Sequence, residues 1–124
     1  MTQITIKRAY QTIPDCGKTQ DALQLDVTGH AGYGANGKDL VCAAESILVQ
    51  AFSAFLAGAN KRDLYHFSVE GIEGRGSVSL CAVPTKGGWD YIRGAFECVV
   101  MGFYLLSRRY PNHVNVRVIK QEEV

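Results

Sequence analysis

The fold depends most on one stretch of the chain, residues 29–46, which has the sequence GHAGYGANGKDLVCAAES and joins two segments of different periodicity. Before it, apolar and polar residues alternate over residues 23–27, which indicates a half-buried strand. After the glycines, residues 40–57 are predicted to form a helix, with Asp39 as a possible N-cap and Gly58 as the C-terminal stop. A glycine-rich loop therefore leads from a strand into a helix.

The same two periodicities predict the remaining elements on either side. Further strands are expected around residues 4–6, 65–69, 78–82 and 114–118, and a second helix over residues 89–110. The order is ββαββαβ without an internal linker or repeat, so residues 1–124 are expected to form a single domain. Because the strands alternate, one face of the sheet is expected to meet water. We therefore predict an α+β fold, a two-layer α/β arrangement with a mixed, mostly antiparallel sheet and two helices on one face.

Composition excludes several classes of protein. The chain has 124 residues, 47% of them hydrophobic and 20% charged, so it can bury a core without disulfides or a structural metal. Thirteen Lys and Arg balance twelve Asp and Glu, which gives a net charge of +1. Strong electrostatic binding to nucleic acid or to a membrane surface is therefore not expected.

Export and membrane insertion are not expected either. Residues 1–10 lack an apolar stretch of signal-peptide length. The most apolar segment, residues 40–56, is interrupted by Glu45 and other polar residues and is predicted to fall short of a membrane span. We therefore expect a cytoplasmic protein.

The four cysteines are too far apart in sequence to form a paired metal or dithiol motif. They are Cys16, Cys42, Cys81 and Cys98. In a reducing cytosol we expect free thiols, and neither a metal nor a cofactor is expected. Cys81 and Cys98 lie in apolar patterns and are predicted to be core residues, whereas Cys16 lies in a predicted turn and is expected to be exposed.

The glycine loop permits two nucleotide-binding interpretations, and the sequence argues against both. Gly32, Gly34 and Gly37 form the G-x-G-x-x-G pattern of dinucleotide-binding folds, but the preceding strand is not buried on both faces, as that fold requires. Gly32, Gly37 and Lys38 also match most of a phosphate-binding loop. That motif needs Ser or Thr at the next position, where Asp39 would place a carboxylate against the phosphates.

A third interpretation pairs His30 with Cys42 as base and nucleophile. Cys42 lies three residues after the predicted N-cap, where unpaired backbone amides and the helix dipole stabilise a thiolate and can lower the thiol pKa. His30 could take the proton across the loop, and Asp39 could cap the helix or orient the imidazole. An oxyanion site could come from the amides near Val41 and Cys42. The alternative is that Cys42 is only a small core residue of an apolar helix.

The motif beginning Gly-His-Ala and continuing through Asp39-Leu-Val-Cys42-Ala resembles the signature of the ribosomal-processing cysteine proteases, the Prp family. Element order and chain length are also similar to that family. The resemblance implies a cytoplasmic homodimer that cuts an amino-terminal extension from a large-subunit ribosomal protein, number twenty-seven. Relatives carried by phages act on capsid and scaffold proteins, so a phage-type substrate is the alternative.

The resemblance assigns roles by position. Cys42 would be the catalytic nucleophile and His30 the base, with Asp39 and Ser46 as supporting residues. The substrate-binding loop would contain Gly29, Gly32, Gly34 and Gly37. Glu45 departs from the family pattern, which leads us to expect a small or apolar residue at that position. Its carboxylate could raise the pKa of the Cys42 thiol, or it could face solvent or a partner chain.

Two further expectations concern partners and rival functions. The predicted helix over residues 40–57 is apolar nearly all round, which suggests that it lies between the sheet and a second subunit and favours a homodimer. The partner implied by the resemblance is a protein substrate, the tail of the ribosomal protein. The rival functions are a catalytically silent peptide-binding dimer and a cysteine-dependent acyl transferase or amidase.

Overall fold

The predicted order of elements, ββαββαβ, is confirmed in a computed structural model that describes residues 1–12, 19–29, 32, 34, 39–72 and 76–120. The seven elements are β1 (Thr2–Thr12), β2 (Thr19–Thr28), α1 (Leu40–Gly58), β3 (Leu64–Ile72), β4 (Ser77–Pro84), α2 (Trp89–Arg109) and β5 (Val114–Lys120). The predicted turn at Pro14–Gly17, which contains Cys16, lies outside the described residues.

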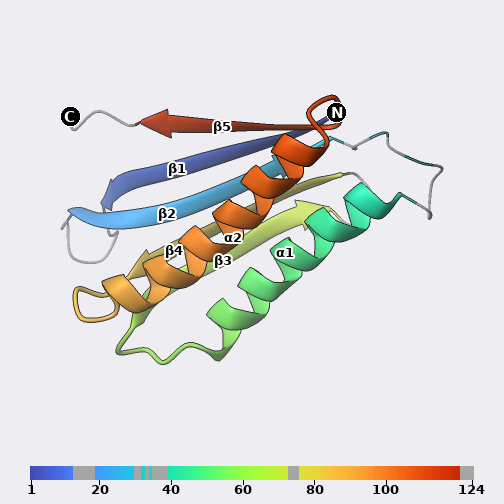
Figure 1. The fold of residues 1–124 in the computed structure, drawn as a ribbon. Coiled ribbons are helices and arrows are strands. Elements are labelled where there is room, and N and C mark those ends of the chain that lie inside the picture. Colours follow the sequence, from blue (N-terminus) through green and yellow to red (C-terminus); the bar gives the residue numbers. More distant parts are fainter. Residues whose placement is uncertain (13–18, 30–31, 33, 35–38, 73–75, 121–124) are drawn as a thin grey trace.

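One five-stranded sheet carries both helices on the same face (Figure 1). The strand order is β3-β4-β2-β1-β5, in which β1 and β5 are parallel and the other three pairs are antiparallel. The α+β fold and the mixed, mostly antiparallel sheet are therefore confirmed. This sheet is not the parallel sheet of dinucleotide-binding folds, which agrees with the argument from the sequence.

The core lies between the sheet and the helices and follows the alternation of the strands. Ile4 and Ile6 of β1 are completely buried, as are Leu23 and Leu25 of β2. The helices contribute large apolar side chains from one face each, namely Val41, Phe52 and Leu56 from α1 and Ile92, Phe96, Val100 and Phe103 from α2. Rings from the two helices meet at the centre, where the centroids of Phe52 and Phe96 are 5.7 Å apart.

The opposite face of the sheet carries polar side chains. Lys7 on β1 forms an ion pair with Asp26 on β2, with 3.5 Å between Nζ and Oδ2. Gln24 and Ser79 also donate hydrogen bonds to the Asp26 carboxylate. These contacts join three adjacent strands on the face that lacks helices, and they explain why the strands alternate in sequence.

Two predictions about cysteines are wrong. Cys98 on α2 is exposed, and Cys81 on β4 is only partly buried. Cys81 is flanked by Leu80 and Ala82, both fully buried, so its side chain lies on the polar face of the sheet. Neighbouring apolar residues in the sequence do not place a cysteine in the core when they lie on the other face of the element.

The outer side of helix α1 is exposed in the single chain, where Leu40 is 71% exposed and Ile47 is 62% exposed. Helix α1 differs from its prediction in one respect. By length and composition it is apolar enough to cross a membrane, contrary to the prediction for residues 40–56. One charged residue does not disqualify a helix by composition, and α1 here packs on the sheet through Val41, Phe52 and Leu56.

Candidate active site

The site is built where the start of α1 meets the end of β2. Asp39 is the N-cap, as predicted, and its Oδ1 accepts hydrogen bonds from the amides of Val41 and Cys42, each at 3.0 Å. Its Oδ2 accepts a further bond from the Gly34 amide at 3.3 Å. The cap fixes the first turn of the helix, and therefore the position of the Cys42 side chain.

The same cap corrects one expectation. The amides of Val41 and Cys42 are the donors suggested above for an oxyanion, and both already donate to Asp39. An oxyanion placed there would have to compete with a carboxylate for the same two hydrogens. The first turn of α1 thus holds Asp39 in place, and Asp39 in turn orders the chain on the loop side at Gly34.

A pocket of about 310 Å³ opens beside Cys42. Three elements form it: the end of β2, the first three turns of α1 and the start of β4. The lining residues are Val27, Gly29, Cys42, Glu45, Ser46, Val49, Gln50, Gly76, Ser77 and Val78. Four of the residues singled out from the sequence, Gly29, Cys42, Glu45 and Ser46, therefore line one cavity of the size that holds a large side chain.

Glu45 is the buried charged group of this pocket. It is only 5% exposed, and its Oε2 accepts a hydrogen bond of 3.0 Å from the hydroxyl of Thr2, itself fully buried on β1. Among the described residues, no group donates to the other oxygen, Oε1. The suggestion that Glu45 faces solvent is therefore wrong, because its side chain points inward beneath the start of β1.

The environment of Glu45 favours its neutral form. Burial is the main cause that raises the pKa of the Glu45 carboxyl above its usual value, while the hydrogen bond from Thr2 opposes this shift. The negative charge of Asp39 raises the pKa further, and the positive charge of the Met1 amino group lowers it. A negative charge at Glu45 thus has little internal compensation in the described part of the molecule.

Gly29 is required by the backbone where β2 ends. Its φ is +88°, and a Cβ at this position would lie 2.8 Å from the carbonyl oxygen of Met1. Its amide donates to the carbonyl of Gly76 at 2.7 Å, which ties the end of β2 to the start of β4. Gly29 is therefore explained by the fold, in addition to its place at the pocket.

The remaining candidates are placed less completely. Ser46 is exposed, lines the pocket and accepts a hydrogen bond from Gln50 at 3.0 Å. Gly32 has a φ of +67°, and a Cβ at this position would meet no described atom within 4 Å. His30 and Gly37 lie outside the described residues, so the predicted pairing of His30 with Cys42 stays a prediction. Within the described part of the chain, no group of three or more His, Cys, Asp or Glu residues could hold a metal ion.

Sequence reasoning missed the contribution of the sheet to this site. Thr2 lies 43 residues before its partner Glu45, and Val78 reaches the pocket because β4 pairs with β2, where it faces Val27. These contacts depend on which strands pair, and no local pattern reports them. The only local signal was that Glu45 departs from an otherwise apolar pattern.

Comparison with known proteins identifies the class first. The model of a protein family described as cysteine protease Prp matches residues 1–115, which places the chain among the cysteine peptidases. The chain belongs to this Prp family. No curated protein sequence matches the chain significantly.

Solved structures show the same fold. A Prp from S. aureus, described as an essential ribosomal processing protease in complex with a covalently linked product peptide, superposes with a TM-score of 0.69 at 16% identity. The match covers 98% of this chain and 100% of the other. SMU.848 from Streptococcus mutans matches with a TM-score of 0.68 and 24% identity, over 98% of this chain and 99% of its own. The S. aureus protease with a substrate peptide gives 0.63 at 16% identity, again over 98% of this chain and 100% of its own.

Proposed function

We propose that this chain is a cysteine endopeptidase in which Cys42 is the nucleophile and His30 the general base. The observation that carries the proposal is the position of Cys42, which lies in the first turn of α1 and lines a pocket of about 310 Å³. A helix start stabilises a thiolate through the helix dipole. Membership of the Prp family supports the same assignment.

The proposed reaction proceeds through an acyl-enzyme. The Cys42 thiolate attacks the carbonyl carbon of the peptide bond, and the C–N bond then breaks as His30 gives a proton to the departing amine. His30 next takes a proton from water, whose oxygen attacks the thioester. The C–S bond breaks, the acid product leaves and Cys42 returns to the thiolate, with the imidazole protonated again.

The proposed substrate is the amino-terminal extension of large-subunit ribosomal protein number twenty-seven. Support comes from the fold shared with the S. aureus protein, which is described as a ribosomal processing protease and was solved with peptides bound. A newly made ribosomal protein is met in the cytoplasm, so the proposed location is cytoplasmic.

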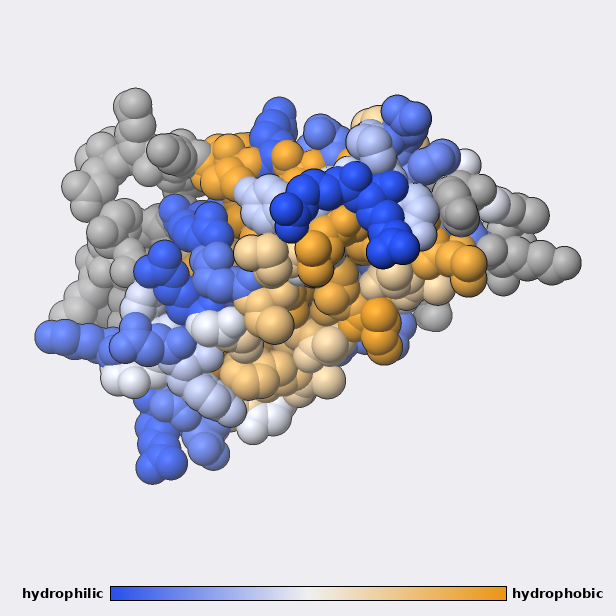
Figure 2. Space-filling view, viewed as in Figure 1, coloured by the Kyte–Doolittle hydropathy of each residue, from blue (hydrophilic) through white to orange (hydrophobic). Residues whose placement is uncertain are grey.

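The proposal includes a homodimer, because apolar side chains lie on the outer side of the helical layer. Figure 2 shows these side chains gathered over α1 and its seam with α2. They include Leu40 and Ile47, exposed by 71% and 62%, and Met101 and Leu105 on α2, exposed by 53% and 54%. Covering such a patch with a second copy would remove it from water. Light scattering at micromolar concentration is expected to give twice the mass of one chain, and a monomer mass would contradict the dimer.

Incubation with the ribosomal protein tests the proposed activity. Mass spectrometry is expected to show release of the extension at a single peptide bond by the unaltered protein and no release by His30→Ala. Cleavage of a phage scaffold protein instead would favour the phage-type substrate. If neither protein is cut while the tail still binds, the chain is a silent peptide-binding module.

A further inference from the structure

A buried hydrogen bond joins the helix of the proposed nucleophile to the first strand of the sheet, because the hydroxyl of Thr2 donates to Oε2 of Glu45 at 3.0 Å. We propose that Glu45 is a positioning residue, which through this bond holds Cys42 in its place relative to the end of β2. The chain continues from that end into His30, the proposed base. The inference rests on the proposed function and adds to it a residue whose carboxyl acts through Cys42.

The place of Glu45 on α1 is the first support. Glu45 is buried among the apolar residues with which this helix packs on the sheet, which are Val41, Phe52 and Leu56. Of residues 42–51, all of which are described, Glu45 alone is buried. Val41 and Glu45 are therefore the buried contacts of the first two turns of α1, and Cys42 lies between them in the sequence.

Thr2 is held in place at the other end of the bond. It is fully buried, its amide donates to the carbonyl of His113 at 2.8 Å, and it pairs with Val114 of β5. A Cβ on Gly29 would lie 3.8 Å from the Cα of Thr2, so the end of β2 packs beside this residue. The bond to Glu45 thus fixes the start of α1 relative to the end of β2.

A carboxyl at this buried position is explained better by positioning than by stability. Apolar contacts stabilise without regard to direction, whereas a hydrogen bond is sensitive to distance and angle. Well-packed apolar side chains often stabilise a domain as much as a buried polar pair does, or more. Burial raises the pKa of the Glu45 carboxyl, so its ionised form is costly here. The pair with Thr2 adds one defined position of the helix on the sheet.

Cys42 is the residue on which this positioning acts. It is three residues before Glu45, so the two are neighbours on adjacent turns of α1, and both line the pocket. Gly29, at the end of β2, lines the same pocket. A displacement of about 1 Å between reacting groups can lower a rate roughly 10²-fold. A shift of α1 on the sheet would therefore slow cleavage even though every reacting group is still present.

Steady-state kinetics on the ribosomal tail test the proposal. Thr2→Val and Glu45→Val each remove one end of the bond, and each is expected to lower kcat by about tenfold while KM changes by less than about twofold. The double variant should be no slower than either single variant, because both changes break the same bond. Losses that multiply in the double variant, or an unchanged kcat in a folded Thr2→Val protein, overturn the proposal.

Conservative variants distinguish the bond from the charge and from general loosening of the domain. Thr2→Ser keeps the hydroxyl, and Glu45→Gln keeps an acceptor oxygen without the charge, so both should retain at least about half of kcat. A loss in Glu45→Gln as large as that in Glu45→Val would show that the bond is not the cause and overturns the proposal.

Glu97→Gln is the matched control, because Glu97 joins the other helix, α2, to β1 through Arg8. It should lose stability and keep kcat. Circular dichroism and thermal unfolding would confirm that each variant is folded at the assay temperature. If Glu97→Gln loses as much of kcat as Thr2→Val does, the effect is one of stability alone and the proposal is overturned.

Alkylation separates this inference from the proposed function. Iodoacetamide at pH 7 would be allowed to compete for Cys42 and Cys98 of the same molecule, and the ratio of the two labels would be measured by peptide mass mapping. The ratio should fall about fivefold in Thr2→Val and recover in Thr2→Ser. If the unaltered protein cuts no peptide, the proposed function fails, but this fall and recovery still support positioning by Glu45. A ratio that is the same in all three proteins overturns it.

Discussion

Glu45 on α1 and Glu97 on α2 both extend from a helix toward β1, yet the molecule treats the two carboxylates in opposite ways. Arg8 of β1 donates to both oxygens of Glu97, from Nε and from Nη2, each at 2.7 Å. Among the residues that the structure describes, Glu45 receives a single bond, from the hydroxyl of Thr2. Burial raises the pKa of Glu45, whereas the hydrogen bond from Arg8 lowers the pKa of Glu97.

The difference shows which of the two is part of the framework. Glu97 is a third exposed and fully paired, and the guanidinium of Arg8 also lies 5.7 Å from the centre of the Phe96 ring. Glu45 is nearly inaccessible and half paired, and it lines the pocket of Cys42. A half-paired carboxylate in that state stabilises the domain less than the fully paired Glu97 does.

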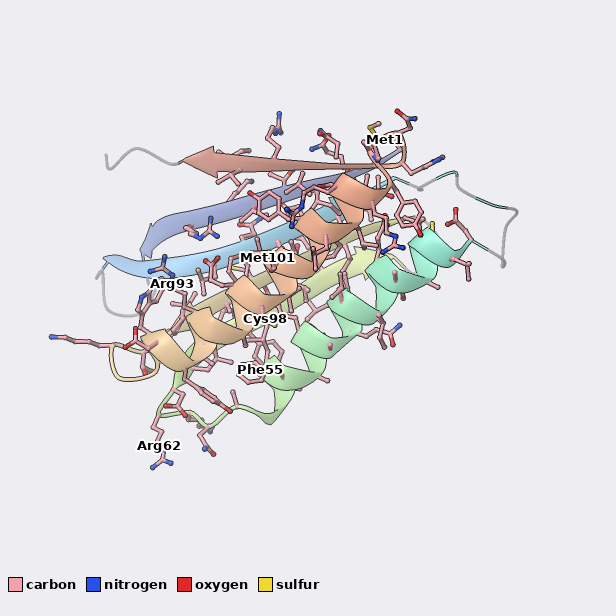
Figure 3. All side chains as sticks on the ribbon, in the orientation of Figure 1. Met1, Phe55, Arg62, Arg93, Cys98 and Met101 are labelled. Atoms are coloured by element: carbon pink, nitrogen blue, oxygen red, sulfur yellow. The ribbon has the colours of Figure 1, made fainter. Side chains whose placement is uncertain are left out.

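The largest expected effect tests whether peptide cleavage depends on the cysteine of α1 and not on the cysteine of α2. Cys42→Ala is expected to lower kcat/KM for the ribosomal tail by at least about 10³-fold, because it removes the nucleophile. Cys98→Ala is the matched control, since Cys98 is an exposed cysteine on α2 (Figure 3). It should leave the rate unchanged.

Alkylation gives the same contrast without a substrate. Iodoacetamide near pH 7, followed by peptide mass mapping, should label Cys42 before Cys98, because only Cys42 lies at a helix start. Full cleavage by a folded Cys42→Ala protein, or faster labelling of Cys98, would contradict the assignment of Cys42 on α1 as the nucleophile.

The second effect is on stability and concerns the bond to Glu45. Thr2→Val removes the hydroxyl that donates to Glu45 and is expected to lower the free energy of unfolding by about 1–3 kcal/mol at neutral pH. Combining Thr2→Val with Glu45→Val should cost less than the sum of the single changes, because no polar group of the pair is then left without a partner. Urea unfolding of the four proteins gives this cycle. Additive losses would show that Thr2 and Glu45 do not interact.

The third effect is a difference in pH dependence. A carboxyl whose pKa is raised on folding opposes folding when ionised, so the cost of Glu45 is present above its folded pKa and disappears as pH falls toward about 4.5. A carboxyl whose pKa is lowered favours folding above about 4.5, and this gain is lost as pH falls through the folded pKa of Glu97.

Two variants separate these contributions. Unfolding free energies measured from pH 7 to pH 3 should show that Glu45→Gln gains most relative to the unaltered protein near pH 7. Glu97→Gln should lose stability near pH 7, and that loss should shrink at the acid end. Two parallel profiles would mean that the carboxyls have similar environments after all.

The features that the sequence predicted are local in origin. Alternation in residues 23–27 predicts a strand whatever the rest of the chain does, and Asp39 caps α1 through amides two and three residues away. These signals are sufficient for the order of elements and for the two-layer arrangement, because each element displays its buried face in its own periodicity.

The features that the sequence missed depend on pairing over long distances. The partner of Glu45 is 43 residues away, and one wall of the pocket comes from β4 because that strand lies beside β2. The exposure of Cys98 likewise depends on which side of α2 faces the core, which Phe96 and Val100 decide. No spacing within the stretch at residues 29–46 contains this information.

The smallest expected effect is on stability and concerns the ion pair between Arg8 and Glu97. Arg8→Lys keeps the positive charge but replaces a planar fork, which reaches both oxygens of Glu97, by a single ammonium group. It also removes the guanidinium beside the Phe96 ring. Because the Glu97 side chain is 37% exposed, solvent screens the pair, and we expect a loss of only about 0.5 kcal/mol in the free energy of unfolding.

Arg8→Met controls for the charge, because it keeps most of the apolar stem and removes every donor. It should lose more than Arg8→Lys at neutral pH, and the two should converge below the folded pKa of Glu97, where no carboxylate charge remains to be paired. Peptidase activity should stay unchanged in both, since neither residue of the pair lines the pocket. A change in cleavage preference in either variant would show that Glu97 and Glu45 are coupled through β1. It would contradict the view that Glu97 belongs only to the framework of the domain and Glu45 to the pocket.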